Sequence, residues 1–600
     1  MYKTTTLLSI LVLISIGQPS LAIQKGDWAS LKRETAEYSQ KLMRKKSLKG
    51  ISIALVDDET LVFSDGYGWA DEKKKIPADT DTVYQVGAIS KIFTALAVMK
   101  LWERGIISLD VPFRRYVPEF LIGSRFPRAK PLTLRTLLTE HSGLPSEILK
   151  NTYTITRPVP FNDYMEKTFA YLREDYLCAP PDTVYANCNL GYALLGWLVQ
   201  KQTGESFVTY TGRELFRAMG MPRTTFSPDR TYANLAKGYV NGRETPLLYV
   251  NDLPAMSAYS SVEEMANFIK AILAHGSFGG ERIIRPRTLK AMMEPQNLRA
   301  EFDADFKIGL GWQLDGYDLI YSERLHYSGP VIWRAGNTVI HSAILMILPR
   351  EKLGVVVLCN TGGAMRELGN IALRCMNLAL EAKTGSLMRR EKEPAAPEIT
   401  LSPKRMKSLE GYFASEYIGF ISIRSTGEHL VMNVMDRDIR LIPHADGSFT
   451  LKYYLFGFIP LNIEILADIR FTIDDIRGKT ALILLKDGKK YFGGMKIDRP
   501  ELPPIWKLRV GKYQIMDQGD DVILFREPRI ILKDGFLIFK ADYAYLKNAS
   551  IMLPLRPLSS SECVVMGLGR FMGQTAKFTQ SNGKIRFSFS GLTLEKIEPN

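Results

Sequence analysis

The sequence predicts a large α/β domain followed by an all-β region, and three observations support this division. In residues 23–383, segments with the character of strands occur near both ends, with helical patterns between them. A stretch rich in Pro, Lys, Arg and Glu, 384–403, lacks hydrophobic periodicity and is typical of a linker. Beyond it, short alternating segments separated by Gly, Asp and Asn continue to the C-terminus, as in barrels and sandwiches.

The elements of the first domain follow from their periodicity. A helical pattern over 31–46 precedes two predicted strands, 50–56 and 61–63, which a polar turn joins. The segment 89–102 is apolar on almost every side, which predicts a helix buried inside a large core. Because strands are predicted at both chain ends, we expect them to form one sheet packed against helices. Further helices are predicted over 134–139, 191–203, 262–274 and 365–382, and further strands over 309–314, 342–348 and 354–358.

The C-terminal region contains two related halves. Residues 409–412 resemble 510–513, each with a Gly and a Tyr, and 470–472 resemble 577–579. We therefore expect two tandem β domains, either barrels or sandwiches, with chance similarity among short strands as the alternative. The expected division is a signal peptide over 1–22, a first domain over 23–383, a linker over 384–403 and β domains over 404–499 and 504–600.

Residues 1–22 have the features of a secretory signal peptide. Lys3 precedes the apolar run 7–16, and small residues within 20–22 form a cleavage site. The run is shorter than a membrane-spanning helix needs, so we expect a periplasmic or secreted protein without a transmembrane segment after cleavage. An uncleaved N-terminal anchor is the alternative.

The composition excludes several functional classes. With 46% hydrophobic and 24% charged residues, the chain is typical of a globular protein. The formal charge is +14, but Lys and Arg are dispersed, so we expect no nucleic-acid partner. Five cysteines in an exported chain leave at least one thiol unpaired; Cys178 and Cys188 are close enough to bridge, although spacing alone does not establish it. The spacing of Cys and His fits no metal site, and we expect neither a metal nor another cofactor.

Several motifs occur in order along the first domain. The segment 84–96 contains Ala88-Ile89-Ser90-Lys91 at the start of the buried helix, and five further blocks follow. Together they resemble the serine β-lactamase and penicillin-binding-protein family, which includes class C β-lactamases and D-aminopeptidase-like and esterase-like hydrolases. The resemblance covers about residues 30–380 and implies a β-lactamase/transpeptidase-like α/β fold. The further blocks are 109–112, 137–145, 191–196, 309–312 and 348–360.

The first motif of the family pairs a nucleophilic serine with a lysine one helical turn later that helps to deprotonate it. Residues three apart share a helix face, so both groups point into one pocket. Here Lys91 is in place, but Ala88 holds the serine position, and a methyl group cannot attack a carbonyl. Ser90 is an alternative nucleophile, yet it lies about 200° around the helix from position 88 and is expected to point away.

The second motif, usually Tyr-x-Asn, aligns with Asn187-Cys188-Asn189. Asn189 is retained, whereas Asn187 replaces the tyrosine, and its amide cannot act as a base. Tyr185, two residues upstream, is an alternative base if the loop presents it to the site. Cys188 is expected to be a buried, inert thiol.

The third motif is a strand whose cationic or polar side chain and backbone N–H groups receive the substrate carboxylate and the oxyanion. Arg334-Ala335-Gly336 aligns with it, while His326 is a rival placement that requires an insertion. The resemblance implies that Arg334 and Gly336 line the binding site, and arginine suits bidentate binding of a carboxylate. The backbone N–H of Asn337 would pair with that of Ala88 as the two oxyanion donors.

Three functional hypotheses follow from these substitutions. The leading one is an exported, catalytically impaired protein that binds a carboxylate-bearing peptide or cell-envelope fragment, since Lys91, Asn189 and Arg334 are kept while Ala88 and Asn187 are not. Loss of a serine nucleophile alone costs on the order of a millionfold in turnover. The second is an active serine hydrolase of the esterase, peptidase or β-lactamase type that uses a displaced nucleophile. The third is an interaction protein that acts through its C-terminal β domains.

Overall fold

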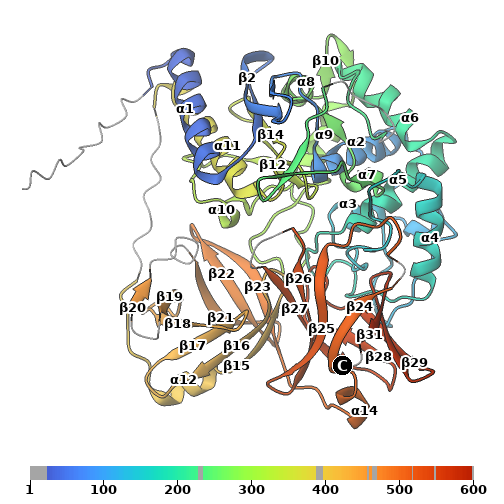
Figure 1. Cartoon of the computed structure of the whole chain (residues 1–600). Coiled ribbons are helices and arrows are strands. Elements are labelled where there is room, and N and C mark those ends of the chain that lie inside the picture. The colour runs from blue at the N-terminus through green and yellow to red at the C-terminus, as the bar shows by residue number, and fades with distance from the viewer. Residues whose placement is uncertain are drawn as a thin grey trace, which may run out of the picture.

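The computed structural model describes three bodies, a mixed α/β domain above two β-barrels (Figure 1). The expected signal peptide, 1–22, lies outside the described residues, as does 387–395 of the expected linker. Among the described residues, no helix combines the length and the apolar character needed to cross a membrane. The described residues are 23–227, 234–386, 396–455, 459–461, 469–516, 518–545 and 549–597.

Strands from both ends of the first domain form one antiparallel sheet, which confirms the expected arrangement. Its order is β12-β13-β14-β1-β2-β3, so strand β1 from the start of the chain pairs with β14 from the end of the domain. The bounds are β1 (Gly50–Asp57), β2 (Thr60–Asp71), β3 (Ile76–Pro77), β12 (Ile332–Asn337), β13 (Ser342–Leu348) and β14 (Leu353–Cys359).

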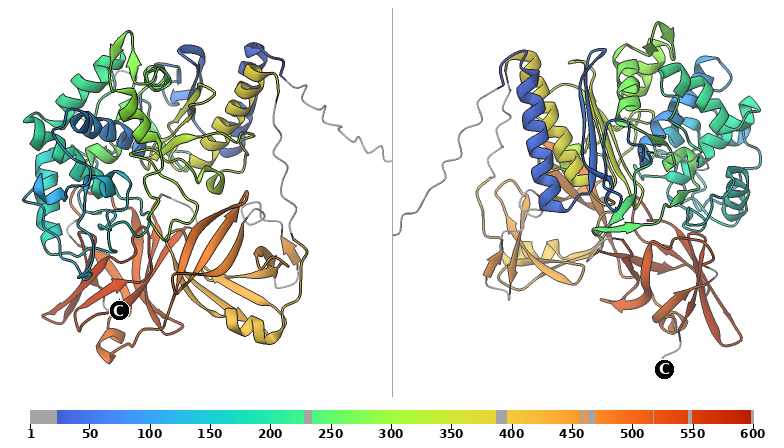
Figure 2. Two further views of the ribbon diagram at one scale, coloured as in Figure 1. Left: turned by 180° about the vertical axis from the view of Figure 1, so that it is seen from behind. Right: turned by 45° about the horizontal axis from the view of Figure 1, so that its top comes forward.

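Helices cover both faces of this sheet. Helices α1 (Trp28–Lys46) and α11 (Met365–Thr384) lie side by side on one face (Figure 2, right). Helices α2 (Ser90–Glu103) and α8 (Val262–Leu273) belong to the opposite face, where α8 packs on β1 and β14. Because successive strand residues face opposite ways, alternate positions of β1 enter two separate hydrophobic cores. The first twelve residues of α2 are buried, as its all-round apolar pattern predicts.

The sequence analysis missed five helices of the first domain, α4, α6, α7, α9 and α10, and one of its predicted strands was wrong. Residues 309–314 form a tight turn between isolated bridges, because Gly311 has φ +87 and reverses the chain. The other helices are α3 (Leu134–Leu138), α4 (Phe161–Arg173), α5 (Asn189–Thr203), α6 (Phe207–Thr211), α7 (Leu253–Met256), α9 (Pro286–Met293) and α10 (Tyr317–Ile320). Short two-stranded pairings join β4 (Tyr84–Gln85) to β9 (Tyr259–Ser260), β5 (Tyr153–Thr154) to β8 (Tyr249–Val250), β6 (Gly238–Val240) to β7 (Arg243–Thr245) and β10 (Ser277–Phe278) to β11 (Glu281–Arg282).

The C-terminal region forms two closed eight-stranded barrels, so the choice between barrels and sandwiches is settled. In the first barrel, β15 pairs with β23, and β18 pairs with β19, which closes the ring. Its strands are β15 (Gly411–Ser415), β16 (Gly419–Ser425), β17 (Leu430–Val434), β18 (Arg437–Pro443), β19 (Phe449–Leu455), β21 (Arg470–Ile476), β22 (Lys479–Lys486) and β23 (Lys489–Ile497), with β20 (Ile459–Leu461) paired to β19. The second contains β24 (Gly511–Ile515), β25 (Phe525–Lys533), β26 (Phe536–Tyr543), β27 (Ser550–Pro557), β28 (Glu562–Val565), β29 (Thr575–Ser581), β30 (Lys584–Phe589) and β31 (Leu592–Lys596).

The two barrels share the features on which the expected repeat rests. A short helix precedes the first strand of each barrel, α12 (Pro403–Leu409) before β15 and α14 (Pro504–Lys507) before β24. The related segments 470–472 and 577–579 both lie in the sixth strand of their ring. The two barrels therefore have the same order of elements along the chain, a short helix followed by the eight strands of the ring.

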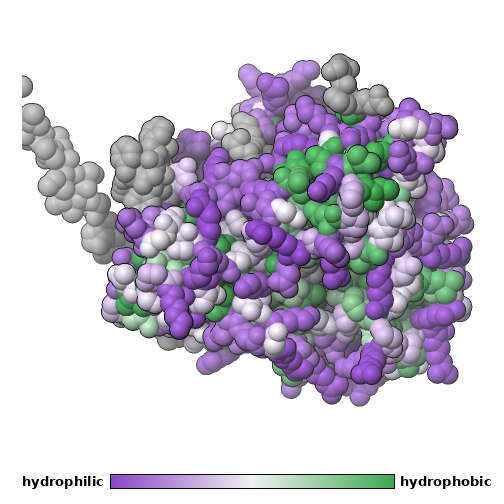
Figure 3. All heavy atoms as spheres, turned by 90° about the horizontal axis from the view of Figure 1, so that it is seen from below, coloured by the Kyte–Doolittle hydropathy of each residue, from purple (hydrophilic) through white to green (hydrophobic). Residues whose placement is uncertain are grey.

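Polar contacts attach both barrels to the first domain. Lys489 Nζ lies 2.6 and 2.7 Å from the carboxylate oxygens of Asp315, and Tyr491 Oη donates to the same group at 3.0 Å. On the second barrel, Asp520 accepts hydrogen bonds from the backbone and the hydroxyl of Thr156. Seen from below, the surface of the barrel side is mostly hydrophilic, and its broadest hydrophobic area lies in the half of the view beneath the second barrel, with smaller ones elsewhere (Figure 3).

Candidate functional site

Ala88 lies in a short 3-10 turn, Gly87–Ile89, immediately before α2. Its methyl group is half-buried, and no oxygen occupies the position of the expected nucleophile. Ser90 is fully buried, and its Oγ accepts a hydrogen bond from the backbone N–H of Ala258 at 2.9 Å. Ser90 therefore faces the core, as its angle around the helix predicts.

Lys91 extends from the first turn of α2 and brings two of the motifs together. Its Nζ donates to Glu140 Oε1 at 2.5 Å and to Asn187 Oδ1 at 2.8 Å. The same ammonium lies 5.1 Å from the centre of the Tyr192 ring, within cation–π range. Its side chain is wholly excluded from solvent, so these contacts replace its hydration.

Glu140 is the site residue that the sequence analysis missed. It follows α3 with φ +60, an uncommon backbone angle for a residue other than glycine. Its other oxygen, Oε2, accepts from Arg334 Nη2 at 2.7 Å, and the backbone N–H of Cys188 donates to Oε1 at 3.1 Å. A signal was present: two buried cations need a counter-charge, and Glu140 is the single acid in the motif block 137–145.

The charges of this cluster determine which groups can exchange protons. Burial lowers the pKa of Lys91 to about 8, although the attraction of Glu140 acts in the opposite direction. Burial alone would raise the pKa of Glu140, but the charges of Arg334 and Lys91 outweigh it and hold that pKa at about 2. At neutral pH the three side chains therefore carry two positive charges and one negative charge, an excess of one cation.

The sequence places the third motif at either Arg334 or His326. Arg334 lies on β12, and its side chain contacts Glu140 in the Lys91 cluster. Arg334 is 2% exposed and points to Glu140. His326 lies in an irregular segment where its backbone N–H donates to Asn377 of α11 at 2.8 Å, beyond the opposite face of the sheet. A Cβ at Gly336 would lie 2.0 Å from the carbonyl oxygen of Val86, so β12 directly abuts the turn that carries residue 88.

Asn337 continues this edge, and its exposed side chain accepts hydrogen bonds from Ser342 Oγ at 3.1 Å and from the backbone N–H of Gly363 at 3.2 Å. A Cβ at Gly87 would lie 2.6 Å from the backbone nitrogen of Asn337. The backbone of Asn337 is thus beside the turn that contains Ala88, where the two oxyanion donors are expected.

Asn189 does not join the cluster around Lys91. Its amide donates to the sulfur of Met256 at 3.3 Å and to Glu147 Oε1 at 3.4 Å. Met256 is buried, and its side chain occupies the space beside the second motif. The retained Asn189 is therefore held by neighbours outside the Lys91 cluster.

The two other candidate proton carriers are protonated at neutral pH. Burial raises the pKa of the Cys188 thiol to about 11, and this sulfur caps α5 by accepting from the N–H of Gly191 at 3.3 Å. Burial also raises the pKa of Tyr185 well above its usual range, and its hydroxyl donates to Glu140 at 3.3 Å. All five cysteines are free thiols, so Cys178 and Cys188 form no bridge.

Hydrogen bonds link the second barrel to residues 146 and 147 of the first domain and to a turn of the first barrel. The guanidinium of Arg570, on the connection between β28 and β29, contacts Glu147. The backbone N–H of Arg570 donates to Glu416 Oε2 at 2.6 Å, in the turn after β15, and that of Phe571 donates to Ser146 Oγ at 3.1 Å. The second barrel is thereby attached to the segment that directly follows the motif block 137–145.

Replacing Glu140 by Gln should destabilise the fold by about 3–5 kcal/mol at pH 7, because two buried cations lose their counter-charge. The pKa of Glu140 is about 2 in the folded protein and 4.5 ordinarily, so its contribution is complete above pH 4.5 and disappears as the pH falls toward 2. Urea unfolding of both proteins between pH 7 and pH 2.5 should show the difference shrinking below pH 4.5.

The matched control is Asp58→Asn, which breaks an exposed pair with Lys352. This change should cost less than about 1 kcal/mol. A Glu140→Gln protein as stable as the Asp58→Asn control would contradict the assigned role of Glu140.

Replacing Gly336 by Ala should cost about 1–3 kcal/mol, because the new methyl group would push β12 away from the turn at Val86. Gly212→Ala is the control, since Gly212 has helical backbone angles and nothing within 4 Å of its Cβ position. That change should be neutral or slightly stabilising. Equal unfolding midpoints for the two variants would show that β12 does not abut the turn.

Comparison with known proteins agrees with this geometry. The family profile named Beta-lactamase matches residues 35–375. The human protein Putative beta-lactamase-like 1 is 27% identical over 444 residues, which are 70% of this chain and 83% of that protein. Protein flp of Staphylococcus aureus (strain MRSA252) is 24% identical over 329 residues, 53% of this chain and 60% of that protein.

Two solved structures show the same fold. The octameric penicillin-binding protein homologue from Pyrococcus abyssi aligns with TM-score 0.51 and 22% identity over 78% of this chain and all of that chain. The crystal structure of SurE aligns with TM-score 0.54 and 19% identity over 78% of this chain and 99% of that chain. The β-lactamase/transpeptidase-like fold that the motifs imply is confirmed. Since the family profile covers more than half of the 600 residues, the chain belongs to the β-lactamase family.

Proposed function

We propose that this chain is an exported β-lactamase-like protein that has lost acyl transfer and binds a carboxylate-bearing peptide or cell-envelope fragment at its former catalytic site. The observation that carries the proposal is the methyl group of Ala88 three residues before Lys91, because covalent catalysis at this position requires a nucleophilic atom. Export rests on the features of residues 1–22.

The loss of a proton carrier supports the same proposal. The amide of Asn187 does not titrate, and at neutral pH the hydroxyl of Tyr185 and the thiol of Cys188 keep their protons. An active hydrolase that uses Ser90 lacks support, because that hydroxyl is fully buried and bonded to the backbone of Ala258.

The excess positive charge favours an anionic ligand. Lys91, Arg334 and Glu140 together carry one net positive charge in a site of low polarity, where a charge acts more strongly than in water. Ala88 and Asn187 are half-buried and give a ligand access to this edge of the cluster. A further solved neighbour is described as SurE with D-Leu, an amino acid with a free carboxylate, which makes D-amino-acid peptides suitable probes.

Ala88→Ser should restore slow covalent labelling by a fluorescent penicillin, because the new hydroxyl would lie one helical turn before Lys91. The unchanged protein and Ser90→Ala should remain unlabelled over the same period on a denaturing gel. Labelling of the unchanged protein that disappears in Ser90→Ala would overturn the proposal and favour an active enzyme.

The peptide N-acetyl-D-alanyl-D-alanine should bind at least about tenfold more tightly than its C-terminal amide in isothermal titration calorimetry. Asn187→Asp should weaken the carboxylate peptide by a similar factor, because it cancels the excess positive charge. Asn241→Asp, in the turn between β6 and β7, is the control of equal charge and should leave binding unchanged. Equal affinity for the acid and the amide would refute a carboxylate site.

A further inference from the structure

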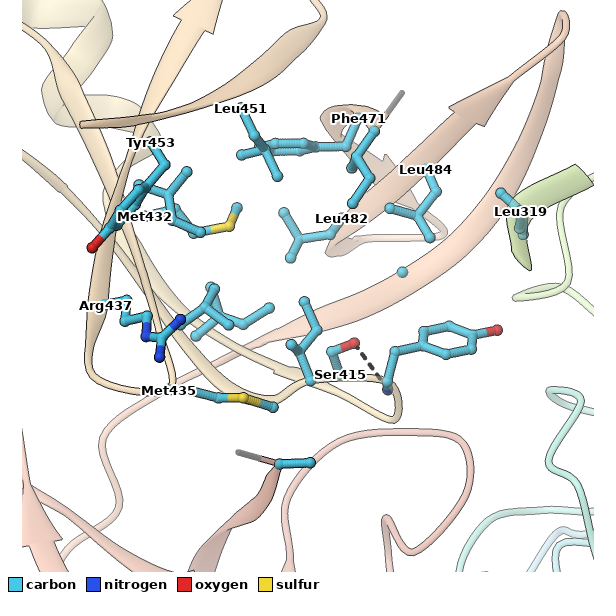
Figure 4. A pocket seen from close by; sticks show the side chains of 18 of the residues that line it. Leu319, Ser415, Met432, Met435, Arg437, Leu451, Tyr453, Phe471, Leu482 and Leu484 are labelled. Carbon is cyan, nitrogen blue, oxygen red and sulfur yellow. Dashed lines mark hydrogen bonds between the residues drawn. The ribbon is translucent and has the colours of Figure 1, made fainter. Parts of the chain in front are cut away.

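A cavity of about 1110 Å³ lies in the first barrel and opens toward the first domain and the second barrel, and none of its lining residues belongs to the Lys91 cluster. This volume is slightly above the range of roughly 300–1,000 Å³ that is common for small-molecule sites. Side chains at alternate strand positions point into it, because successive residues of a strand face opposite sides of a barrel. The close-up view shows Met432, Leu451, Phe471, Leu482 and Leu484 around the open space (Figure 4).

One end of this barrel is closed by apolar packing. Helix α12 contributes Met406 and Leu409, both buried, to the same hydrophobic cluster as Met432 and Phe471. The sulfur of Met406 is 3.9 Å from the hydroxyl of Ser425, the last residue of β16, so this helix covers the end at which β16 finishes. The cavity is therefore a cup with an apolar base.

The opposite end carries positive charge. Arg437 is the first residue of β18, and Lys486 is the last of β22. The antiparallel register places both at the end where β16 begins, and both line the cavity. Lys486 follows Leu482 and Leu484 at two-residue intervals, so it continues their inward-facing row.

The acids near this mouth already have partners. Asp436 lies 2.5 Å from Lys533 Nζ and 2.6 Å from Lys540 Nζ, and Asp487 lies 3.2 Å from Arg324. By contrast, four cations that line the cavity form no ion pair with any residue that the structure describes. They are Arg366 from the first domain, Arg437 and Lys486 from the first barrel, and Arg526 from the second.

We propose that the first barrel binds a single-chain amphipathic anion, with the alkyl chain inside the cup and a carboxylate or phosphate head group at the basic mouth. Burial of the chain against leucine, methionine and phenylalanine side chains provides the apolar contact, and the unpaired cations select an anionic head. The mouth is bounded by Leu319 and Tyr321 of the first domain, so the head group would lie between barrel and domain. This site shares no residue with the Lys91 cluster and does not depend on its proposed function.

The test uses the full-length protein and cis-parinaric acid, a fluorescent long-chain fatty acid. Saturable binding of about one molecule per chain is expected, with displacement by palmitate and at least tenfold weaker displacement by methyl palmitate, which lacks the charge. Competition between dodecanoate and dodecyl phosphate then distinguishes a fatty-acid source from a phospholipid source. No saturable binding, or equal displacement by palmitate and its methyl ester, would overturn the proposal.

Two substitutions locate the ligand. Leu451→Trp should reduce the affinity for the probe at least tenfold by filling the cup, and Arg437→Gln should reduce it by weakening the hold on the head group. Arg424→Gln is the control of equal charge and should bind normally, because Arg424 is an exposed residue of β16 that pairs with Asp438 and does not line the cavity. Unchanged thermal unfolding checks that the variants fold, and Arg437→Gln binding as well as Arg424→Gln would contradict the site.

Discussion

The bridge that Glu140 forms between Lys91 and Arg334 is the interaction on which the site depends. It connects helix α2, the turn after α3 and the edge strand β12, elements separated by 49 and 194 residues along the chain. Each cation would be costly to bury alone, because the low polarity of the interior replaces its hydration poorly. The carboxylate satisfies both cations at once and thereby fixes the relative positions of the three motifs.

Under the proposed function, this bridge also explains how the site keeps its architecture after acyl transfer is lost. The serine oxygen is needed for reaction, but no buried charge relies on it, so a methyl at Ala88 leaves the ion pairs intact. Removing Glu140 or either cation would instead leave an uncompensated buried charge. Electrostatic attraction for an anion can therefore outlast acyl transfer, and this is the physical basis of the proposed binding function.

Much of the first domain could be predicted because its signals are local. Apolar periodicity identified α2, and motif spacing identified Lys91, Asn187 and Arg334. In the structure Lys91 and Arg334 both contact Glu140, and Asn187 contacts Lys91. The sequence analysis did not identify Glu140 as a site residue because its partners, Lys91 and Arg334, are distant in sequence. The strand expected at 309–314 was wrong because the left-handed backbone of Gly311 overrides its apolar pattern. Closure of the barrels and the cup in the first one depend on register between distant strands, which a single sequence does not encode visibly.

The most direct test of the account is a crystal structure of the unchanged protein soaked with a penicillin or a D-alanyl peptide. The account predicts an intact ligand whose carboxylate lies near Lys91 and Arg334, with no covalent bond to any side chain. Continuous density joining the ligand to an atom of Ser90, Tyr185 or Cys188 would contradict it.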